Sequence, residues 1–265
     1  MAVLRKGNKG NEVFKLQEGL IRLGYSDIIS DGIFGTKTEN AVKDYQRSNG
    51  LVVDGIVGQA TYEEICQDLV PGMYLTEEDY SKAAKELDIE VAVIKAFSKV
   101  ESGGRSAFLS PGKPVILFEG HVFWRQLEKN GLDPNKFTKG NSDILFPKMN
   151  SKSYKGGAAE YDRLNRAISI HEKSAYESMS SGKFQILGNN AESLGYKSAK
   201  DMYLEFCKGE YNQLIGFVRF IKVNPTLHKA LKNKNWAKAA ECYNGKNYKV
   251  YNYDIKLANA YRQYK

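Results

Sequence analysis

Three short segments, far apart in the sequence, carry side chains that could bind a polar ligand and transfer a proton. They are Glu101-Ser102-Gly103-Gly104, Gly182-Lys183-Phe184-Gln185-Ile186-Leu187-Gly188 and Tyr243-Asn244-Gly245. A carboxyl group can act as a general acid or base, and an amide can donate and accept hydrogen bonds together. Each segment alone is weak evidence, because Glu before Ser-Gly-Gly also occurs at helix ends and Tyr-Asn-Gly also occurs in turns.

Glu101 is predicted to lie at the end of a helix. Apolar residues recur at helical spacing over residues 80 to 87 and again over 93 to 100, with Asp88 as the predicted cap between the two helices. The negative end of the helix dipole and an apolar surrounding both disfavour the carboxylate anion, so Glu101 should keep its proton to a higher pH than usual. That property suits a general acid, although this segment alone also fits an ordinary exposed glutamate.

A second carboxylate, Glu119, follows a short apolar run at residues 114 to 118 that predicts a brief strand. Glu119 could activate water in an inverting hydrolysis if the two carboxyl groups lie roughly 6.5 to 9.5 Å apart. It could equally form a structural ion pair or a cap. His121 lies nearby, but no partner histidine has the spacing of a metal site.

The order Glu-Ser, Gly-x-x-Gln-Ile and Tyr-Asn resembles the goose-type lysozyme and soluble lytic transglycosylase superfamily. Over about residues 75 to 265 the flanking segments narrow the resemblance to the N-acetylmuramidase domain of modular bacteriophage endolysins. Those segments are Ile116-Leu117-Phe118-Glu119-Gly120-His121-Val122-Phe123 and Glu160-Tyr161-x-Arg163-Leu164. One difference is Ser181, because the family usually has Trp there, and any sugar stacking or packing by that Trp is in doubt.

The resemblance implies a role for each segment. Phe184 and Gln185 would line the sugar groove beside the acid, and Tyr243 and Asn244 would position the N-acetylmuramyl unit, although Tyr-Asn-Gly could instead be a turn after a helix at residues 236 to 242. The expected reaction is hydrolysis of the β-1,4 bond after N-acetylmuramic acid, with water as nucleophile and no metal or organic cofactor. Two alternatives stay open: a lytic transglycosylase that forms anhydro-muramyl products, and a non-catalytic wall-binding or tail-structural protein.

An internal repeat lies ahead of these segments. Asp31-Gly32-Ile33-Phe34-Gly35-x-x-Thr38 recurs 23 residues later as Asp54-Gly55-Ile56-Val57-Gly58-x-x-Thr61. Asp-Gly favours a tight turn, and the apolar pair can pack inward. Thr36-x-x-Glu39 and Thr61-x-x-Glu64 have the pattern of capping boxes that start helices, and an amphipathic stretch before Gly24 predicts another helix. Three short helices are expected.

This arrangement resembles the small peptidoglycan-binding domain of cell-wall hydrolases over about residues 3 to 68. The repeat itself is explained by turns and core packing, so the binding role comes from the resemblance. Asp31, Tyr45, Gln46 and Asp54 are the predicted rim residues of a wall-binding surface.

The helical pattern stops near residue 70 and restarts at Thr76-x-x-Asp79. We therefore expect a peptidoglycan-binding domain at residues 1 to 69, a linker at 70 to 76 and a catalytic domain at 77 to 265. The expected fold class is mainly α, with a three-helix binding domain followed by a lysozyme-like helical domain that contains a small β element.

Composition and charge limit which partners and which cellular location we expect for the protein. The 265 residues are 42% hydrophobic, no segment has the apolar run of a signal peptide or membrane span, and the three cysteines show no metal-ligand spacing. Residues 1 to 70 hold 8 basic and 10 acidic residues, which leaves 31 basic and 21 acidic residues for the rest. The basic half could attract anionic envelope polymers or simply be a solvated surface, and it lacks a nucleic-acid-binding motif. We expect a monomer made in the host cytoplasm, whose export to the wall depends on a membrane-permeabilising lysis protein.

Overall fold

A computed structural model describes residues 3–70, 73–104, 107–110 and 112–265. The chain divides into two compact units, Met1–Tyr74 and Leu75–Lys265. The expected linker at residues 70 to 76 includes this division, and its residues 71 and 72 lie outside the described part of the chain.

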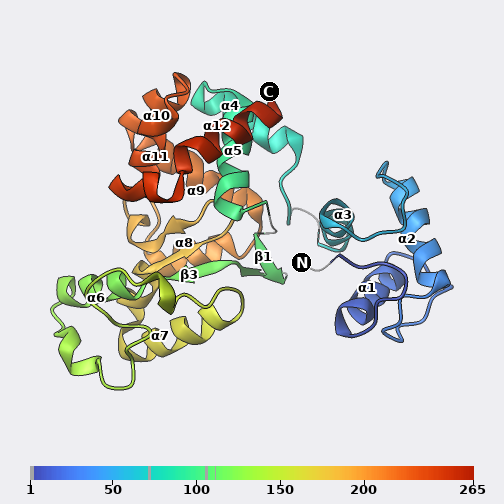
Figure 1. Cartoon of the computed structure of the whole chain (residues 1–265), viewed down its shortest axis with the longest axis horizontal. Coiled ribbons are helices and arrows are strands. Elements are labelled where there is room, and N and C mark those ends of the chain that lie inside the picture. Colours follow the sequence, from blue (N-terminus) through green and yellow to red (C-terminus); the bar gives the residue numbers. More distant parts are fainter. Residues whose placement is uncertain (1–2, 71–72, 105–106, 111) are drawn as a thin grey trace. The chain divides into compact units, whose positions relative to one another are not determined.

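The first unit is a three-helix module, as predicted (Figure 1). Its helices are α1 (Asn11–Arg22), α2 (Thr36–Ser48) and α3 (Gln59–Leu69). The helix α1 ends where Gly24 adopts a φ of 99°, which a residue with a side chain would adopt at a cost. The apolar faces of the helices enclose a small core, which consists of Leu4, Val13, Leu16, Leu20, Ile28, Phe34, Ala41, Val42, Tyr45, Val57 and Ile65.

Two buried glutamines fasten the repeated turns to the helices in the same way. Gln17 donates to the Asp31 carboxylate (2.9 Å) and to the Thr38 hydroxyl (3.0 Å), and it accepts from the backbone N–H of Gly32 (2.8 Å). Gln46 makes the equivalent contacts in the second copy, at 2.9, 3.1 and 2.9 Å to Asp54, Thr61 and Gly55. Each repeat is therefore one structural unit built around a buried amide.

The predicted capping boxes in this unit are wrong. Gly35 and Gly58 occupy the N-cap positions, both with extended backbone, and no side chain caps either helix. Thr36 is the first helical residue of α2, and Thr61 lies inside α3, where its buried hydroxyl accepts from Gln46. In the second repeat the glutamine network uses Thr61, the predicted cap, whereas in the first repeat it uses Thr38 and not the predicted cap Thr36.

The second unit is predominantly helical and contains a small β element, which confirms the fold class. Its first helices are α4 (Glu77–Leu87), α5 (Val91–Ser102), α6 (Gly120–Lys129) and α7 (Ala159–Glu177). They are followed by α8 (Ala199–Phe206), α9 (Glu210–Lys222), α10 (Pro225–Lys232), α11 (Trp236–Asn244) and α12 (Tyr253–Tyr264). Short 3-10 turns lie at Pro134–Phe137, Ser151–Ser153, Gly188–Asn190 and Lys246–Tyr251.

The strands form two antiparallel sheets. Strand β1 (Phe108–Ser110) pairs with β2 (Lys113–Pro114), and β4 (Met179–Ser181) lies between β3 (Ile116–Phe118) and β5 (Ile186–Leu187). The register places Ile116 opposite Ser181 and Phe118 opposite Met179. The predicted strand at residues 114 to 118 is therefore present, with an interruption at residue 115.

Two hydrophobic cores lie on either side of this β element. One is formed by α4, α5 and α8 to α12 with the loop at residues 184 to 186, and the other by β3, β4, α6 and α7. Figure 1 shows β3 between the helices α4, α5 and α9 to α12 and the helices α6 and α7. The carboxyl end of α5 and the end of β3 consequently face the region where the two cores meet.

Helix boundaries in the second unit confirm the predicted caps. Thr76 and Asp79 form a capping box at the start of α4, as expected. Asp88 is a cap between the two helices, as expected: it ends α4 in the left-handed region (φ 50°), whereas Glu90 is the N-cap of α5. The helix α5 ends at Ser102, where Gly103 adopts a φ of 61° and turns the chain directly after Glu101.

Candidate active site

Glu101 lies in the last turn of α5, where burial raises the pKa of its carboxyl from 4.5 to about 7. The Asn244 side-chain amide donates a hydrogen bond to Glu101 Oε1 at 3.1 Å, and this bond and the charge of Lys256 act in the opposite direction on that pKa. Desolvation is the largest effect, since an ion loses more than a neutral acid when water is removed. Glu101 can therefore hold a proton at neutral pH and release it when an acceptor approaches.

Asn244 reaches Glu101 because Tyr243 is fixed in the core. The Tyr243 ring packs edge-on against Phe97 (5.1 Å between centroids) and Phe220 (5.1 Å), and its hydroxyl donates to the backbone carbonyl of Phe184 at 2.6 Å. Tyr243 and Asn244 form the end of α11 and not a turn after it. Tyr243 thus joins α11 to the loop that carries Gln185, and its hydroxyl is engaged within the protein.

In the loop at residues 182 to 188, the side chains of the two predicted ligand-binding residues, Phe184 and Gln185, lie in different surroundings. Phe184 is 1% exposed and stacks on Phe217 at 4.3 Å, so its side chain belongs to the core and does not line the groove as expected. Gln185 is partly exposed and has a φ of 46°, a left-handed conformation that is strained for a residue with a side chain. Its Nε2 donates to the carbonyl of Gly182 at 2.8 Å.

Ser181 occupies a position where the family pattern would place Trp. It is 1% exposed and pairs with Ile116 and Ile186 in the three-stranded sheet. Within the described part of the chain its hydroxyl has no hydrogen-bond partner. The small side chain is enclosed by the sheet and its neighbours, so it presents no surface to a sugar ring.

Glu119 lies between β3 and α6, at the N-cap position of α6. Its backbone N–H donates to the carbonyl of Ser178, and the Ser180 hydroxyl donates to its carboxylate at 3.3 Å. Burial raises the pKa of Glu119, against smaller opposite effects of Ser180 and Arg125. His121 Nε2 lies 3.7 Å from Glu119 Oε2, and burial lowers the pKa of that histidine, which disfavours a charged pair.

Tyr253 lies within electrostatic reach of Glu101 and Glu119, and no sequence pattern identified it. Burial, with smaller electrostatic effects of Glu101, Tyr251 and Glu119, raises the pKa of Tyr253 to about 12. Because Coulomb interactions decline with distance, both carboxylates must lie near this ring. Tyr253 begins α12, which packs along α5, so tertiary contact rather than any motif brings it there.

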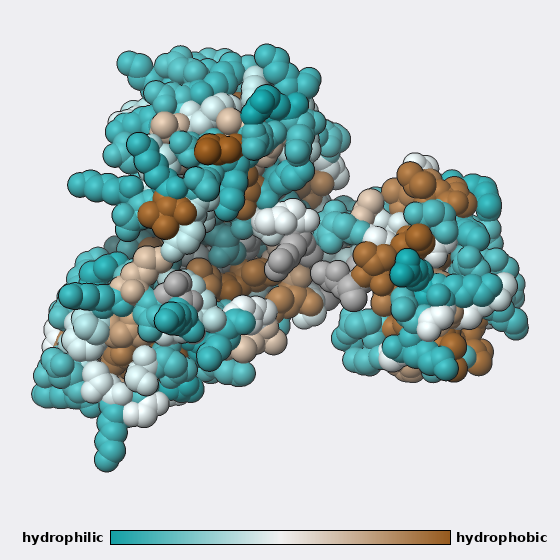
Figure 2. Space-filling model, in the orientation of Figure 1, coloured by the Kyte–Doolittle hydropathy of each residue, from teal (hydrophilic) through white to brown (hydrophobic). Residues whose placement is uncertain are grey.

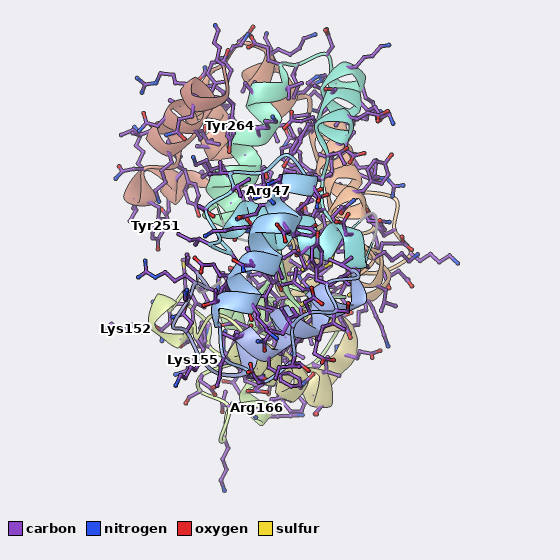
Figure 3. All side chains as sticks on the ribbon, turned by 90° about the vertical axis from the view of Figure 1, so that its right-hand side faces the viewer. Arg47, Lys152, Lys155, Arg166, Tyr251 and Tyr264 are labelled. Carbon is purple, nitrogen blue, oxygen red and sulfur yellow. The ribbon has the colours of Figure 1, made fainter. Side chains whose placement is uncertain are left out.

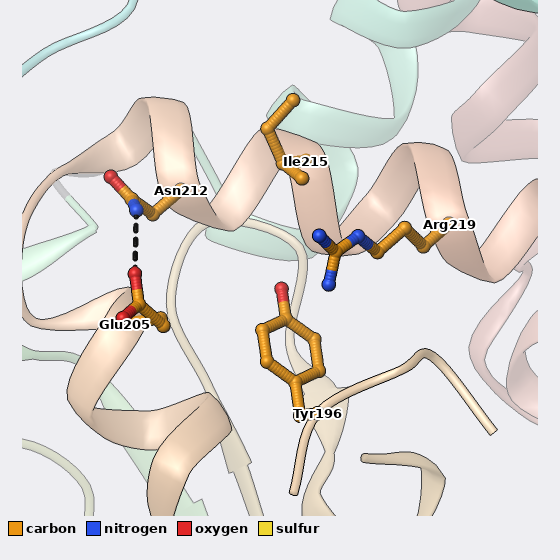
Figure 4. A pocket seen from close by; sticks show the side chains of 5 residues that line it. All are labelled: Tyr196, Glu205, Asn212, Ile215 and Arg219. Atoms are coloured by element: carbon orange, nitrogen blue, oxygen red, sulfur yellow. Dashed lines mark hydrogen bonds between the residues drawn. The ribbon is translucent and has the colours of Figure 1, made fainter. Parts of the chain in front are cut away.

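The face of the unit that Figure 2 presents is hollowed between its two lobes, with apolar residues in the hollow. A separate cavity lies elsewhere, against α8 and α9, and is lined by Tyr196, Glu205, Asn212, Ile215 and Arg219 (Figure 4). Asn212 donates to Glu205 at 3.0 Å, and the Arg219 guanidinium lies 4.9 Å from the Tyr196 ring centre. None of the predicted catalytic residues lines that cavity.

Of the four predicted rim residues of the first unit, two are exposed and two are buried. Asp31 and Asp54 are exposed, and hydrogen bonds from Gln17 and from Ile56, respectively, are the largest effects that lower their pKa. Tyr45 and Gln46 are 2% and 1% exposed, so they do not lie at the rim. Tyr45 instead donates to the Asp68 carboxylate at 2.5 Å, and Gln46 holds the second turn. Burial is the physical reason for this correction.

Fold and site together define a modular protein in which a three-helix module precedes a lysozyme-like helical unit with a half-buried, proton-retaining glutamate. The family model for N-acetylmuramidase matches residues 90–265, and the model for a putative peptidoglycan binding domain matches residues 9–65. The chain belongs to the N-acetylmuramidase family, with a peptidoglycan-binding domain at its N-terminal side.

One solved structure is similar over the whole chain, and two curated relatives are similar over about a quarter of it. The crystal structure of a Burkholderia AP3 phage endolysin is 37% identical, covers 99% of both chains and superposes with a TM-score of 0.69. A spore cortex-lytic enzyme of Oceanobacillus iheyensis is 35% identical over 65 residues, which are 24% of each chain. The N-acetylmuramoyl-L-alanine amidase CwlL of Bacillus licheniformis is 43% identical over 61 residues, 22% of this chain and 17% of the relative. The chain thus covers a quarter or less of these curated relatives.

Proposed function

We propose that this protein is an endolysin that hydrolyses the β-1,4 bond between N-acetylmuramic acid and N-acetylglucosamine in peptidoglycan. The family model over residues 90–265 and the full-length likeness to a phage endolysin support the substrate class. The observation that carries the mechanism is the half-buried Glu101, in which desolvation raises the pKa to about 7 and so keeps a transferable proton at neutral pH.

Glu101 protonates the glycosidic oxygen as the bond to the sugar breaks. The Asn244 amide already donates to Glu101 Oε1, so it stabilises the carboxylate that forms when the proton leaves. This bond also lowers the pKa of Glu101 before transfer, but burial outweighs it, so the proton is still retained until an acceptor approaches. Gln185, which is partly exposed on the adjoining loop, is the proposed hydrogen-bonding partner of the sugar N-acetyl group or hydroxyl.

Glu119 is the proposed base that activates water in an inverting displacement. Its carboxylate accepts from Ser180 and shares the neighbourhood of Tyr253 with Glu101, which supports a common cleft. In this mechanism water attacks the sugar carbon as Glu119 takes its proton, and Glu101 protonates the leaving oxygen. The reaction needs only these groups, and we propose no metal or organic cofactor.

The first unit is proposed to hold the enzyme on the wall. The peptidoglycan-binding model covers residues 9–65, and attachment at a second place raises the effective concentration of the catalytic unit without changing its chemistry. The basic catalytic unit would add a salt-dependent attraction to anionic envelope polymers. In the described residues no helix has the length and apolarity to cross a bilayer. We propose that the protein acts as a monomer and reaches the wall from the host cytoplasm through a membrane-permeabilising lysis protein.

The test combines one variant with product analysis. Glu101→Gln keeps the shape and the hydrogen bond from Asn244 but cannot donate the proton, so lysis of purified peptidoglycan should fall at least ~10²-fold in a folded protein. Near wild-type lysis by that variant contradicts the assignment of the acid. Mass spectrometry of wild-type products should show reducing muramyl ends. Products lighter by one water would instead identify a lytic transglycosylase, in which the muramyl 6-hydroxyl replaces water.

A further inference from the structure

A buried ion pair lies directly behind β3, away from the groups assigned to the chemistry. Glu160 and Arg163, in the first turns of α7, have side chains that are 0% and 3% exposed, and Arg163 Nη1 lies 2.6 Å from Glu160 Oε2. The pKa of Glu160 remains below its usual value, because hydrogen bonds from three backbone N–H groups and the charge of Arg163 together outweigh the effect of burial. Glu160 is therefore held as an anion inside the protein.

Both partners of the pair bind the same residue, Phe118, which immediately precedes Glu119. The Phe118 N–H donates to Glu160 Oε2 at 3.0 Å, and the Phe118 carbonyl accepts from Arg163 Nη1 at 2.7 Å. The Arg163 guanidinium also lies 5.4 Å from the centre of the Phe118 ring. Main-chain and side-chain contacts thus fix the end of β3 in position and direction.

The same pair ties two further segments to this point. Glu160 Oε1 accepts from the N–H groups of Lys155 (2.6 Å) and Gly156 (3.0 Å), and Arg163 Nη2 donates to the carbonyl of Asp143 (2.7 Å). Tyr161, between the two charged residues, donates to the carbonyl of Pro114 at 2.6 Å, near the start of β3. The segment Glu160-Tyr161-x-Arg163 consequently anchors the chain at both ends of this strand.

We propose that the Glu160–Arg163 pair is a positioning device that aims the carboxylate of Glu119 into the cleft. This inference rests on the proposed role of Glu119 as the base. A buried ion pair is weak evidence for a contribution to stability, since desolvation offsets much of the attraction. Its fixed geometry is the stronger explanation here, because reaction rates depend on the placement of the catalytic groups to within about 1 Å.

The decisive variant is Arg163→Lys, which keeps the positive charge but cannot reach the Phe118 and Asp143 carbonyls together. Arg166→Gln is the matched control. Arg166, labelled in Figure 3, lies one turn further along α7 and binds the Asp143 carboxylate at 2.8 and 2.9 Å. Its side chain is 43% exposed and, among the described residues, makes no hydrogen bond or ion pair with β3. Both variants are assayed on soluble peptidoglycan fragments, at temperatures where circular dichroism shows the full folded signal.

We expect Arg163→Lys to lower kcat roughly 10- to 100-fold while KM stays within about twofold, since the groups that hold substrate are unchanged. Burial raises the pKa of Glu119, so a displaced carboxylate that gains water should shift the acidic limb of the kcat/KM profile to lower pH. His121, Arg125, Ser180, Tyr154 and Tyr253 are polar or charged groups around Glu119. The Arg163 guanidinium lies 5.9 Å from the centre of the Tyr154 ring, and Arg163→Lys keeps a positive charge beside that ring. Arg166→Gln should leave kcat and the profile unchanged.

Measuring Glu119→Gln in parallel distinguishes the proposed role of Glu119 as the base from the proposed positioning role of the Glu160–Arg163 pair. If Glu119→Gln is inactive but folded Arg163→Lys has wild-type kcat and an unshifted acidic limb, the positioning role is overturned and the role of Glu119 stands. If Glu119→Gln itself keeps wild-type activity per folded molecule, the proposed base is wrong and the positioning role is lost with it. Loss of stability in Arg163→Lys without any change in kcat also overturns the proposal.

Discussion

Replacing Glu101, the proposed catalytic acid, should stabilise this protein, and the gain should grow with pH. The pKa of Glu101 rises from 4.5 to about 7 on folding, chiefly because burial disfavours the anion. Between these two values the folded state binds more protons than the unfolded state, so wild-type stability falls as the pH rises from about 4.5 to about 7. Glu101→Gln carries no ionisable proton and escapes this loss.

The size of the effect follows from the two pKa values. Linkage gives a wild-type penalty of about 0.8 kcal/mol at pH 5 and about 3.4 kcal/mol at pH 8.5, where Glu101 is ionised in both states. The side chain is only partly enclosed, so solvent screening reduces the difference between these figures. We expect the stability advantage of Glu101→Gln to grow by about 2 kcal/mol from pH 5 to pH 8.5.

Differential scanning calorimetry on the full chain is the suitable assay, because the two units can unfold separately and only the catalytic transition should respond. Glu241→Gln is the control, since the hydrogen bond and charge of Lys238 lower the pKa of this exposed glutamate on the neighbouring α11. That variant should gain no stability at alkaline pH. A Glu101→Gln advantage that is constant from pH 5 to 8.5, or that declines with pH, refutes the argument that burial keeps Glu101 protonated.

Three further predictions concern the second carboxylate and the first unit. Glu119→Gln should suppress lysis strongly, and azide should not restore activity with retained configuration, because no covalent intermediate precedes water attack; normal specific activity with a lowered melting temperature would leave Glu119 a structural residue. Deletion of residues 1 to 70 should leave a folded but slower enzyme, and the isolated module should sediment with insoluble peptidoglycan, so a module that stays in the supernatant contradicts its binding role. Gln46→Leu should lower the stability of the module by about 2 to 4 kcal/mol, since the Gly55 N–H and the Thr61 hydroxyl lose their buried partner; intact stability with lost wall binding would restore Gln46 as a contact residue.

The local pattern of the sequence determined much of the fold. The repeat at Asp31 and Asp54 predicted two equivalent turns, each followed by a helix, and apolar spacing predicted the helix before them, because these features depend on neighbouring residues. The same holds for Glu101, whose position in the last helical turn before two glycines could be read directly. The capping boxes at Thr36 and Thr61 failed, since a buried glutamine from another helix competes for the second repeat's threonine.

The hydrogen bonds and burial of the candidate active-site residues depend on contacts between distant segments, which no local sequence pattern contains. The sequence supplied Glu101 and Asn244 as candidates, but only the packing of Tyr243 against Phe97 and Phe220 brings the amide of Asn244 to the carboxyl. A motif also cannot tell which side chain faces the groove, and Phe184 beside Gln185 turned into the core.

The sequence by itself determined the order of the elements, the helical class and the residues that could carry a proton. The tertiary structure decided how strongly Glu101 holds that proton, because desolvation depends on every element that covers the carboxyl and not on its neighbours in the chain. It likewise placed Tyr253 near both carboxylates and Glu160 and Arg163 behind Phe118. Burial and long-range hydrogen bonds are properties of the folded chain, and for that reason they appear only when its distant segments are packed together.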